Sequence, residues 1–200
     1  MLHYRGSRIR VEGEAGYREI WLARPDARNA IDTEMRDELF ESLNAIAGDG
    51  SIRGIGLLAE GPDFCAGGDI GEFGSATDVA LASNIRLLRS LPQLMLRLRD
   101  RLVVGIQGSA VGAGIELAAF ARRVVAGTNA RFRLPELEMG LIPGAGGTVS
   151  ITRRIGPARA LQMILEGSWV LAPEAHALGL VDELVDEHLL ADRIRKVASA

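Results

Sequence analysis

Short apolar runs, glycine-rich segments and amphipathic helices follow one another along this chain, and this order constrains the fold more than any other feature. Ile55 to Ala59 and Leu102 to Ile106 are each long enough for one buried strand, and a glycine-rich segment follows both runs. Helical patterns come after these segments. Strands that alternate with helices in this way are typical of layered mixed domains, so we expect an α/β fold.

The same patterns place the remaining elements. Alternating apolar residues predict two strands within 8–23, joined by a turn at Gly13 to Gly16. Asp32 is a typical N-cap of a helix that ends at Gly48, because Met35, Leu39, Leu43 and Ile46 follow it at helical spacing. Further strands are expected near 124–125 and 131–134, and further helices over roughly 78–99, 145–155, 157–166, 173–178 and 189–198.

Composition indicates one globular domain over residues 1–200. Of the 200 residues 48% are hydrophobic and 24% are charged, which is enough apolar material for a sizeable core. A formal net charge of −3 gives no general attraction to nucleic acid or to an anionic membrane, so neither is expected as a partner. The N-terminus lacks the apolar core of a signal peptide, and no apolar run reaches the ~20 residues of a membrane span. We therefore expect a cytoplasmic protein.

The cysteine and histidine content predicts neither a disulfide nor a metal site. Cys65 is the single cysteine, and His3, His176 and His188 are scattered without the spacing of metal ligands. Because none of these histidines shares a motif with Cys65, we expect the thiol to be a small packing residue and not a nucleophile. We expect no bound metal and no separate cofactor.

Two glutamates, Glu116 and Glu136, each lie inside a glycine-rich segment of their own. Two carboxyl groups in one pocket are driven to different pKa values, so one can act as an acid while the other acts as a base. Each glutamate alone has a simpler explanation: Glu116 could form an ion pair with Arg122 or Arg123, and Glu136 could be an exposed loop charge like Glu138. Their occurrence together with two glycine-rich loops favours a catalytic pair.

Two glycine-rich segments, 61–70 and 108–118, could present backbone N–H groups to a ligand. The second segment runs from a strand into a helix, whose first turn has unpaired N–H groups and the positive end of the helix dipole. Two such sources on separate loops could form an oxyanion hole for a thioester or a similar carbonyl group. Nucleotide phosphate binding is the competing interpretation, but the chain has neither the P-loop ending nor the Rossmann fingerprint. The run Gly144 to Thr148 also lacks a lysine and more simply lets a helix start pack against a neighbouring loop.

An ordered set of motifs resembles the enoyl-CoA hydratase/isomerase superfamily, also called the crotonase family. The motifs are Arg24-Pro25 with Asn29-Ala30-Ile31, Phe64 to Ile70, Gly112 to Ala118, Pro135-Glu136, Gly140 to Thr148, Gly156, and Ala175 to Val181. The resemblance covers nearly the whole chain in order. It implies a crotonase-like spiral of β-β-α units that binds acyl-CoA thioesters, with CoA as part of the substrate.

The resemblance also assigns roles to individual residues. It implies that the backbone N–H groups of Gly68 and Ala113 hold the thioester oxygen. It further implies that CoA and the acyl group lie along the first glycine-rich loop, and the residues expected to contact them are Ala66, Asp69, Ile70, Phe73 and Arg28. In hydratases of this family both motif glutamates are present, so Glu116 would help to deprotonate a water for attack at Cβ and Glu136 would deliver a proton to Cα.

We therefore expect a lyase, a 2-enoyl-CoA hydratase of fatty acid metabolism or a close acyl-thioester variant. A double-bond isomerase and a decarboxylase that acts on an acyl thioester, carried by CoA or by a carrier protein, are alternatives, because proton transfer at Cα is common to all of them. From a different class, the chain could be a non-catalytic partner subunit that stabilises a homologue.

The chain departs from the family pattern at three places. Relatives usually continue past Gly179-Leu180-Val181 into further helices that cover the site and build a trimer, whereas this sequence ends at Ala200. We expect a shortened C-terminal helical region over 185–200, and a homo-oligomer, a trimer or hexamer, that this region alters. The usual Lys-Pro before the central strand is Arg101-Leu102, and an arginine, Arg122 or Arg123, replaces an aspartate after the first glutamate helix.

Overall fold

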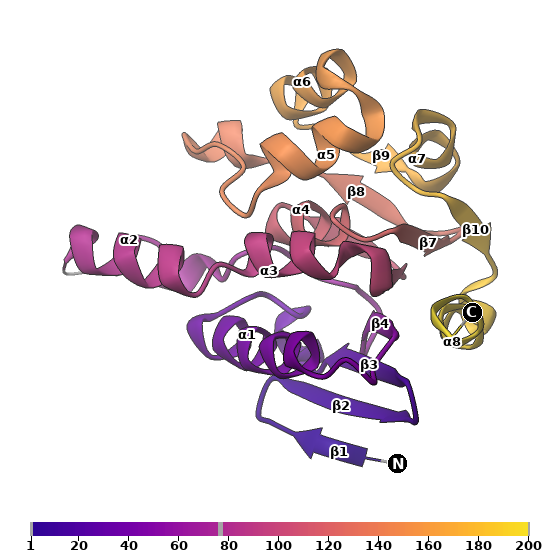
Figure 1. Cartoon of the computed structure of the whole chain (residues 1–200). Helices are drawn as coiled ribbons and strands as arrows, with labels where there is room; N and C mark the ends of the chain where they lie inside the picture. The colour runs from indigo at the N-terminus through magenta and orange to yellow at the C-terminus, as the bar shows by residue number, and fades with distance from the viewer. Residues whose placement is uncertain (1, 76–77, 200) are drawn as a thin grey trace.

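A seven-stranded sheet forms the centre of the computed structural model, which describes residues 2–75 and 78–199 (Figure 1). Its strands lie in the order β1 (Leu2–Arg5), β2 (Ile9–Glu14), β3 (Tyr17–Leu22), β4 (Gly54–Ala59), β5 (Leu102–Ile106), β7 (Arg123–Gly127) and β10 (Glu183–Val185). The first three strands pair antiparallel, and β3 to β10 pair parallel. A second sheet contains β6 (Ser109–Val111), β8 (Arg131–Arg133) and β9 (Val170–Leu171).

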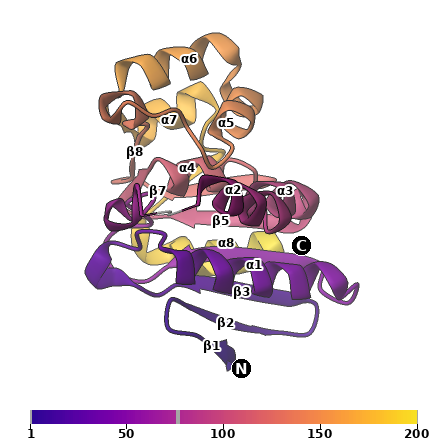
Figure 2. The ribbon, with the colours of Figure 1, turned by 90° about the vertical axis from the view of Figure 1, so that its left-hand side faces the viewer.

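Eight α-helices lie within the described residues, and short 3₁₀ helices connect several of them. The α-helices are α1 (Thr33–Gly48), α2 (Val79–Leu88), α3 (Leu91–Leu98), α4 (Ala113–Ala118), α5 (Gly147–Ile155), α6 (Pro157–Glu166), α7 (Ala172–Leu178) and α8 (Leu190–Ala198). The 3₁₀ helices are η1 (Pro25–Ala27), η2 (Ile70–Glu72), η3 (Arg99–Arg101), η4 (Glu136–Met139) and η5 (Glu187–Leu189). Figure 2 shows α5, α6 and α7 together at one end of the molecule and β1 and β2 at the other.

Successive β-β-α units explain the two sheets. In the unit β5-β6-α4 the first strand joins the large sheet and the second joins the small sheet, and β7 and β8 repeat this division before α5. Each unit therefore advances both sheets by one strand and leaves a helix start beside the junction. The α/β fold that the sequence patterns predicted is confirmed, and so are the β-β-α units that the resemblance implied.

The large sheet is buried on both faces, as its central strands require. Leu57, Val104 and Val124 belong to the main core with α1 and α3, whereas their neighbours Leu58, Val103 and Val125 face the other side and pack against α8. Successive side chains of a strand point to opposite faces, so the central strands β4 and β5 are apolar throughout.

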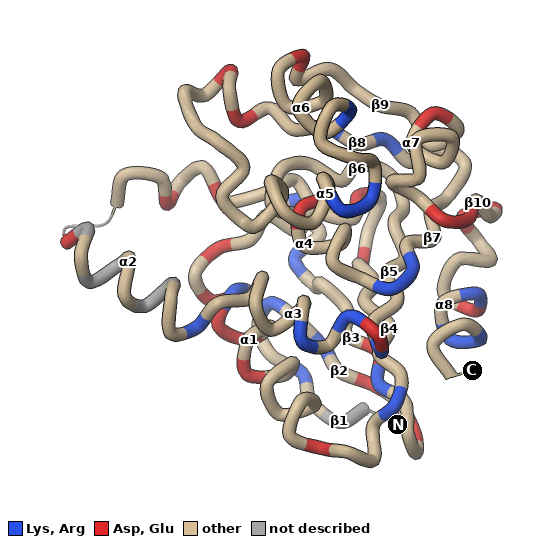
Figure 3. Tube along the Cα trace, turned by 45° about the horizontal axis from the view of Figure 1, so that its top comes forward, with Lys and Arg blue, Asp and Glu red and all other residues tan. Residues whose placement is uncertain are grey.

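Helix α8 packs against the sheet where three glycines leave room for it. A Cβ atom on Gly105 would lie 2.8 Å from Ile194 Cγ1, and Gly54 and Gly56 leave similarly little space below the helix. Arg195 of α8 donates to the buried Glu19 carboxylate at 2.9 Å, and the hydroxyl of Tyr17 donates to the same carboxylate oxygen. Figure 3 shows the charged residues that α8 carries. A salt bridge thus fixes α8 at a close-packed position.

The prediction for α1 is confirmed. The Asp32 side chain accepts a hydrogen bond from Met35 N at 2.7 Å, and Met35, Leu39, Leu43 and Ile46 are the buried residues of the helix. The paired strands within 8–23 and the strands near 124–125 and 131–134 are also confirmed, as parts of β2, β3, β7 and β8. The sequence analysis did not identify β1, β6, β9 and β10.

The single helix expected over 78–99 is wrong, because the structure has two helices, α2 and α3, with a break at Arg89-Ser90. Ser90 caps α3, with its side chain accepting from Gln93 N. Pro92 has no backbone N–H to donate to the turn before it, so the first helix cannot continue. Residues 76–77, near the predicted start, lie outside the described residues.

Within residues 2–75 and 78–199 no helix is long and apolar enough to cross a membrane. The same residues contain no group of three or more His, Cys, Asp and Glu side chains arranged to hold a metal ion. The expected absence of a cofactor stays a prediction.

Candidate active site

The two predicted N–H donors, those of Gly68 and Ala113, lie at one junction between the sheets. The loop before Gly68 pairs with β6, because Cys65 N donates to Ser109 O at 3.1 Å and Val111 N donates to Cys65 O at 2.9 Å. On its other side, Ile31 N donates to Gly67 O and Asp69 N donates to Ile31 O. A Cβ atom on Gly67 would lie 3.9 Å from Ala113 N. The structure therefore brings the two predicted donors together.

Neither of these N–H groups has a hydrogen-bond partner in the described part of the chain. Gly68 N points away from the bonds with Ile31, which use its neighbours Gly67 and Asp69. Ala113 is the first residue of α4, where no carbonyl precedes it in the helix. Both groups are half-buried. Two free donors at one place suit a carbonyl oxygen that gains negative charge.

Cys65 packs against the start of α4 at this junction. Its side chain is fully buried, and a Cβ atom on Gly114 would lie 2.8 Å from Cys65 Cβ, so the start of α4 packs directly on it. Burial raises the pKa of the thiol to about 12, which keeps it protonated. The expectation of a packing residue is confirmed.

Glu116 lies on α4, with its side chain buried, and its carboxylate faces the start of α5. Its Oε2 accepts hydrogen bonds from Ala145 N and Gly147 N, both at 2.8 Å. A Cβ atom on Gly147 would lie 2.6 Å from Glu116 Cγ, so this position accepts only glycine without a shift. Ser150 Oγ also donates to the backbone carbonyl of Glu116. The glycine run therefore packs against a glutamate of α4 and not, as predicted, against a loop.

The simpler explanations of both glutamates are wrong. Arg122 donates to the carbonyl of Val197 and Arg123 forms an ion pair with Glu183, so neither pairs with Glu116. Glu136, on η4, is buried, whereas the side chain of its neighbour Glu138 is 55% exposed in an ion pair with Arg133.

Glu136 reaches back over the start of α4. A Cβ atom on Gly112 would lie 2.7 Å from Glu136 Oε1, and Gly112 has a φ of 48°, which favours glycine. The second oxygen, Oε2, is buried and has no hydrogen-bond partner in the described residues. A buried polar atom without a partner is costly, and such atoms are typical of sites that act on a bound group.

Burial raises the pKa of both carboxyl groups. For Glu116 it does so to about 7, and the nearby charge of Glu136 adds to the effect, while the N–H groups of Gly147 and Ala145 oppose it. Burial also raises the pKa of Glu136, while its own backbone N–H and the nearby Glu116 side chain oppose that rise. The two groups interact directly, so they titrate as a pair that can hold one proton near neutral pH.

Most of the residues predicted to contact CoA and the acyl group lie on the first loop, residues 61–70, or directly after it. Ile70 is 70% exposed and Phe73 is 50% exposed, and the Phe73 ring lies 3.1 Å from the place of a Cβ on Gly68. Ala66 is half-buried beside them. Arg28 lies outside this loop, but its Nε donates to Asp63 of the loop at 2.8 Å. The contacts of these residues with a ligand stay predictions.

Asp69 differs from the other four predicted contact residues, because its carboxylate is engaged on the inner side of the loop with Arg24. The sequence analysis missed this pair, and it missed the donors Ala145 and Gly147 and the close approach at Gly112. The run Gly144 to Thr148 was the available signal, but a helix start does not reveal which carboxylate it receives.

Two cavities lie away from the glutamate pair. An apolar one of about 20 Å³ lies among α1, α3 and α4 and has Cys65 and Gly114 in its wall. A hollow of about 190 Å³ lies among Arg99, Arg122, Arg153 and Arg154, at the far ends of α4 and α5. Neither is lined by Glu116 or Glu136, so neither is the candidate site.

Comparison with known proteins agrees with this geometry. The model of the family described as enoyl-CoA hydratase/isomerase matches residues 12–200. The 2,3-dehydroadipyl-CoA hydratase of Escherichia coli (strain K12) is 37% identical over 183 residues, which cover 90% of this chain and 70% of that protein. The 1,2-epoxyphenylacetyl-CoA isomerase of the same strain is 33% identical over 190 residues, which cover 92% and 72%.

A solved structure gives the same result for the fold. The enoyl-CoA hydratase from Bacillus anthracis matches with a TM-score of 0.88 at 29% identity, over 96% of this chain and 76% of that one. The crotonase-like fold expected from the resemblance is thereby confirmed. The names of the relatives are those of enzymes that act on CoA thioesters, and the sequence match extends through both glutamate segments. The chain belongs to the enoyl-CoA hydratase/isomerase family.

Proposed function

We propose that this protein is a 2-enoyl thioester hydratase, which adds water in the syn direction across the Cα=Cβ bond. One observation carries the proposal: two buried carboxyl groups interact with each other, Glu116 on α4 and Glu136 over the start of that helix, which also presents the free N–H of Ala113 close to that of Gly68. Hydration needs a base, an acid and a site for negative charge, and this arrangement contains all three.

In the proposed reaction, the N–H groups of Gly68 and Ala113 donate to the thioester oxygen. Glu116 accepts a proton from water while the water oxygen bonds to Cβ, and the π electrons move onto the thioester as an enolate. Glu136 then gives its proton to Cα. One proton enters the pair and one leaves it, so the pair returns to its starting charge after proton transfer between the two groups.

The scheme needs the proton of the pair on Glu136, whereas the pKa shifts favour it on Glu116 in the protein without substrate, so the proton has to pass from Glu116 to Glu136 before water attacks. A pKa near 7 for Glu116 and a raised pKa for Glu136 allow one carboxyl group to be protonated while the other is ionised at neutral pH. Loss of one oxyanion donor costs ~3 to 4 kcal/mol in known enzymes, and positioned acid or base catalysis contributes ~10²- to 10⁴-fold. These effects together are enough for an efficient enzyme.

The substrate would lie along the first loop. We propose that Ala66, Ile70 and Phe73 contact the CoA thioester, with Phe73 next to the acyl group and Arg28 near a phosphate. Arg28 would have to exchange its partner Asp63 for the phosphate. The same proposal includes a homo-oligomer in the cytoplasm and a role in fatty acid metabolism.

The test follows the loss of the enoyl-thioester absorbance when the protein is added to crotonyl-CoA. We expect turnover by the wild type and a fall of at least ~10²-fold in kcat for Glu116→Gln and for Glu136→Gln. Glu138→Gln is the matched control, because this neighbour of Glu136 is exposed, and its kcat should be unchanged. Turnover like that of the wild type in both Gln variants would contradict the mechanism.

Double-bond isomerisation is the second candidate, favoured by the similarity to an enoyl-CoA isomerase/hydratase of Mycosarcoma maydis, which is 33% identical over 178 residues. It would use the same oxyanion hole and proton transfer at Cα without adding water. Product analysis in H₂¹⁸O separates the two, because only hydration places the label at Cβ. Carbon dioxide release from a carboxyacyl thioester would indicate a decarboxylase. Absence of thioester binding, together with a change in the activity of a full-length homologue, would indicate a non-catalytic partner.

A further inference from the structure

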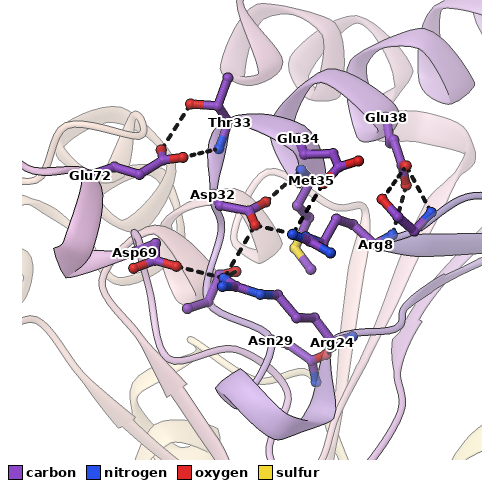
Figure 4. Close-up of polar contacts among 12 residues, drawn as sticks. Arg8, Arg24, Asn29, Asp32, Thr33, Glu34, Met35, Glu38, Asp69 and Glu72 are labelled. Carbon is purple, nitrogen blue, oxygen red and sulfur yellow. Dashed lines mark hydrogen bonds and ion pairs between the residues drawn. The ribbon is translucent and has the colours of Figure 1, made fainter. Parts of the chain in front are cut away.

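A chain of charged residues connects Arg8 to the loop that carries Gly68, residues 61–70, which we call the oxyanion loop (Figure 4). Arg24 Nη1 donates to Asp69 Oδ2 at 2.6 Å and lies 3.4 Å from Asp32 Oδ2. Arg8 Nε donates to the same oxygen of Asp32 at 2.7 Å. The same Arg24 nitrogen also donates to the backbone carbonyl of Ala30. Arg24 thus joins the N-cap of α1 to the residue that follows Gly68.

Asp69 is held on every side that the structure describes. Its backbone N–H donates to Ile31 O at 3.0 Å, its Oδ1 accepts from Gly71 N at 3.0 Å, and its Oδ2 accepts from Arg24. The hydrogen bond from Arg24 is the main reason that the pKa of Asp69 lies below its ordinary value. The Asp69 side chain is therefore ionised, and its two oxygens accept from Gly71 N and from Arg24.

The segment that carries Arg24 fixes the earlier part of the loop as well. Asn29 is fully buried with a φ of 54°, and its Nδ2 donates to the carbonyls of Glu60 and Asp63 at 2.8 and 2.9 Å. Its Oδ1 accepts from Arg24 N at 2.9 Å. Both ends of the oxyanion loop therefore depend on Arg24, at one end through its side chain and at the other through its backbone.

We propose that Arg24 is a positioning residue that sets the direction of the Gly68 N–H through Asp69; this inference rests on the proposed function. Gly67 and Gly68 have no side chains to pack, so their peptide planes take their orientation from the residues around them. An oxyanion donor must lie within hydrogen-bond distance of the developing charge, and a small rotation of its peptide weakens that bond. The Arg24–Asp69 pair supplies the constraint on one side of this peptide.

The experiment compares Arg24→Gln and Asp69→Asn with Arg8→Gln. Arg8 is the matched control, because its side-chain exposure of 28% is close to the 24% of Arg24 and it shares Asp32 but forms no ion pair with Asp69. We expect kcat on crotonyl-CoA to fall about 10- to 100-fold in Arg24→Gln and Asp69→Asn, with KM changed less than about threefold. Arg8→Gln should stay within about threefold of the wild type. The double variant should lose little more than either single one.

Absorption spectroscopy reports the position of the donor directly. An aryl-enoyl thioester such as cinnamoyl-CoA absorbs at longer wavelength when its carbonyl is polarised, so we expect a red shift on the wild type and a smaller one on Arg24→Gln at saturation. An unchanged shift and unchanged kcat in Arg24→Gln would overturn the positioning role and leave the proposed function standing. A wild type that neither turns over crotonyl-CoA nor shifts the spectrum would instead overturn the proposed function.

Amide hydrogen exchange tests, without any substrate, whether the structure of the oxyanion loop depends on Arg24. We expect faster exchange over residues 64–72 in Arg24→Gln than in Arg8→Gln. Equal exchange in the two variants would overturn the inference even if turnover fell, since the loop would then not depend on Arg24.

Discussion

The site has two parts, the loop from Glu60 to Glu72 and the segment that follows Glu136, and different interactions hold them in place. The loop from Glu60 to Glu72 contains four acidic residues, and each has a partner outside the loop: Arg10, Arg28, Arg24 and Thr33. The segment from Met139 to Thr152, which follows Glu136, has no charged residue, and it is drawn in tan in Figure 3. Leu141 is 42% exposed there and Ile142 is 72% exposed.

This difference shows which kind of interaction positions each part of the site. Ion pairs and hydrogen bonds are directional, so they suit the loop that aims a donor at one oxygen. The segment around Glu136 is held by two backbone hydrogen bonds to the Glu116 carboxylate and by the fit of small residues, with Gly112 below the Glu136 carboxylate and Gly147 against Glu116. The first part should therefore respond mainly to charge changes, whereas the second should also respond to changes of volume.

The largest effect is expected where volume is most restricted, at Gly112. In Gly112→Ala the new Cβ would lie 2.7 Å from Glu136 Oε1 on a backbone that only glycine adopts easily. We expect a loss of ~1 to 3 kcal/mol in stability and of ~10²-fold in kcat. Gly140→Ala is the control, since Gly140 also has a positive φ, 69°, but nothing within 4 Å of its Cβ position. Equal loss of kcat in both variants, measured on crotonyl-CoA, would refute the role of volume.

The second prediction concerns the pH dependence of stability at Glu116. Its pKa is about 7 in the folded protein and 4.5 in the reference state, so the folded state binds more protons between these values. The stability that this proton provides is present below about 4.5 and is lost as the pH rises through 7. We expect Glu116→Gln to be ~1 to 3 kcal/mol more stable than the wild type at pH 8, and equally stable at pH 4. Urea unfolding at both pH values tests this, and a variant that is less stable at pH 8 would contradict it.

A smaller effect is expected at Glu72, where charge connects η2 to α1. Glu72 accepts from Thr33 N and from Thr33 Oγ1, both at 2.9 Å. Glu72→Gln removes a charge from the start of α1 and one acceptor oxygen, which should lower stability by ~0.5 to 1 kcal/mol. Glu34 follows Thr33 in the first turn of α1, but its side chain is 53% exposed, so Glu34→Gln is the control. Thermal unfolding checks the difference, and equal melting temperatures would show that this connection does not stabilise the fold.

The smallest effect is expected at the exposed apolar surface of the second part. Ile142→Ser should change the stability of this chain by less than ~0.5 kcal/mol, because the side chain is 72% exposed. Urea unfolding at two protein concentrations gives the measurement. A larger loss that grows on dilution would show that Ile142 is covered in an assembly.

Local patterns predicted most of the fold, and tertiary contacts explain the failures. The cap at Asp32 and the apolar spacing behind it identify α1 correctly, because both act within one helix. The break at Ser90 was missed because the apolar spacing continues across it, although Pro92 was visible. β6 was hidden within a glycine-rich segment, since its three residues form a strand only through pairing with β8 and with the loop at Cys65.

The site shows the same limit. Glu116 and Glu136 were identified from their sequence context, and the structure buries both and places Glu136 over Gly112, next to the predicted donor Ala113. The donors to Glu116, Ala145 and Gly147, could not be predicted because they are backbone groups on another helix, and any residue has an N–H. The Arg24–Asp69 pair joins residues far apart in the sequence, and no local pattern connects them.

The close packing of α8 on the sheet has an evolutionary consequence. A side chain at Gly54, Gly56 or Gly105 would push the helix away from the sheet and separate Arg195 from Glu19, which would leave a buried carboxylate without its cation. A single replacement at any of these positions is thus penalised twice, once by volume and once by charge. Neutralisation of Glu19 would remove only the second penalty, so we expect Gly54, Gly56 and Gly105 to stay restricted by volume even in descendants that have lost the pair of Arg195 and Glu19.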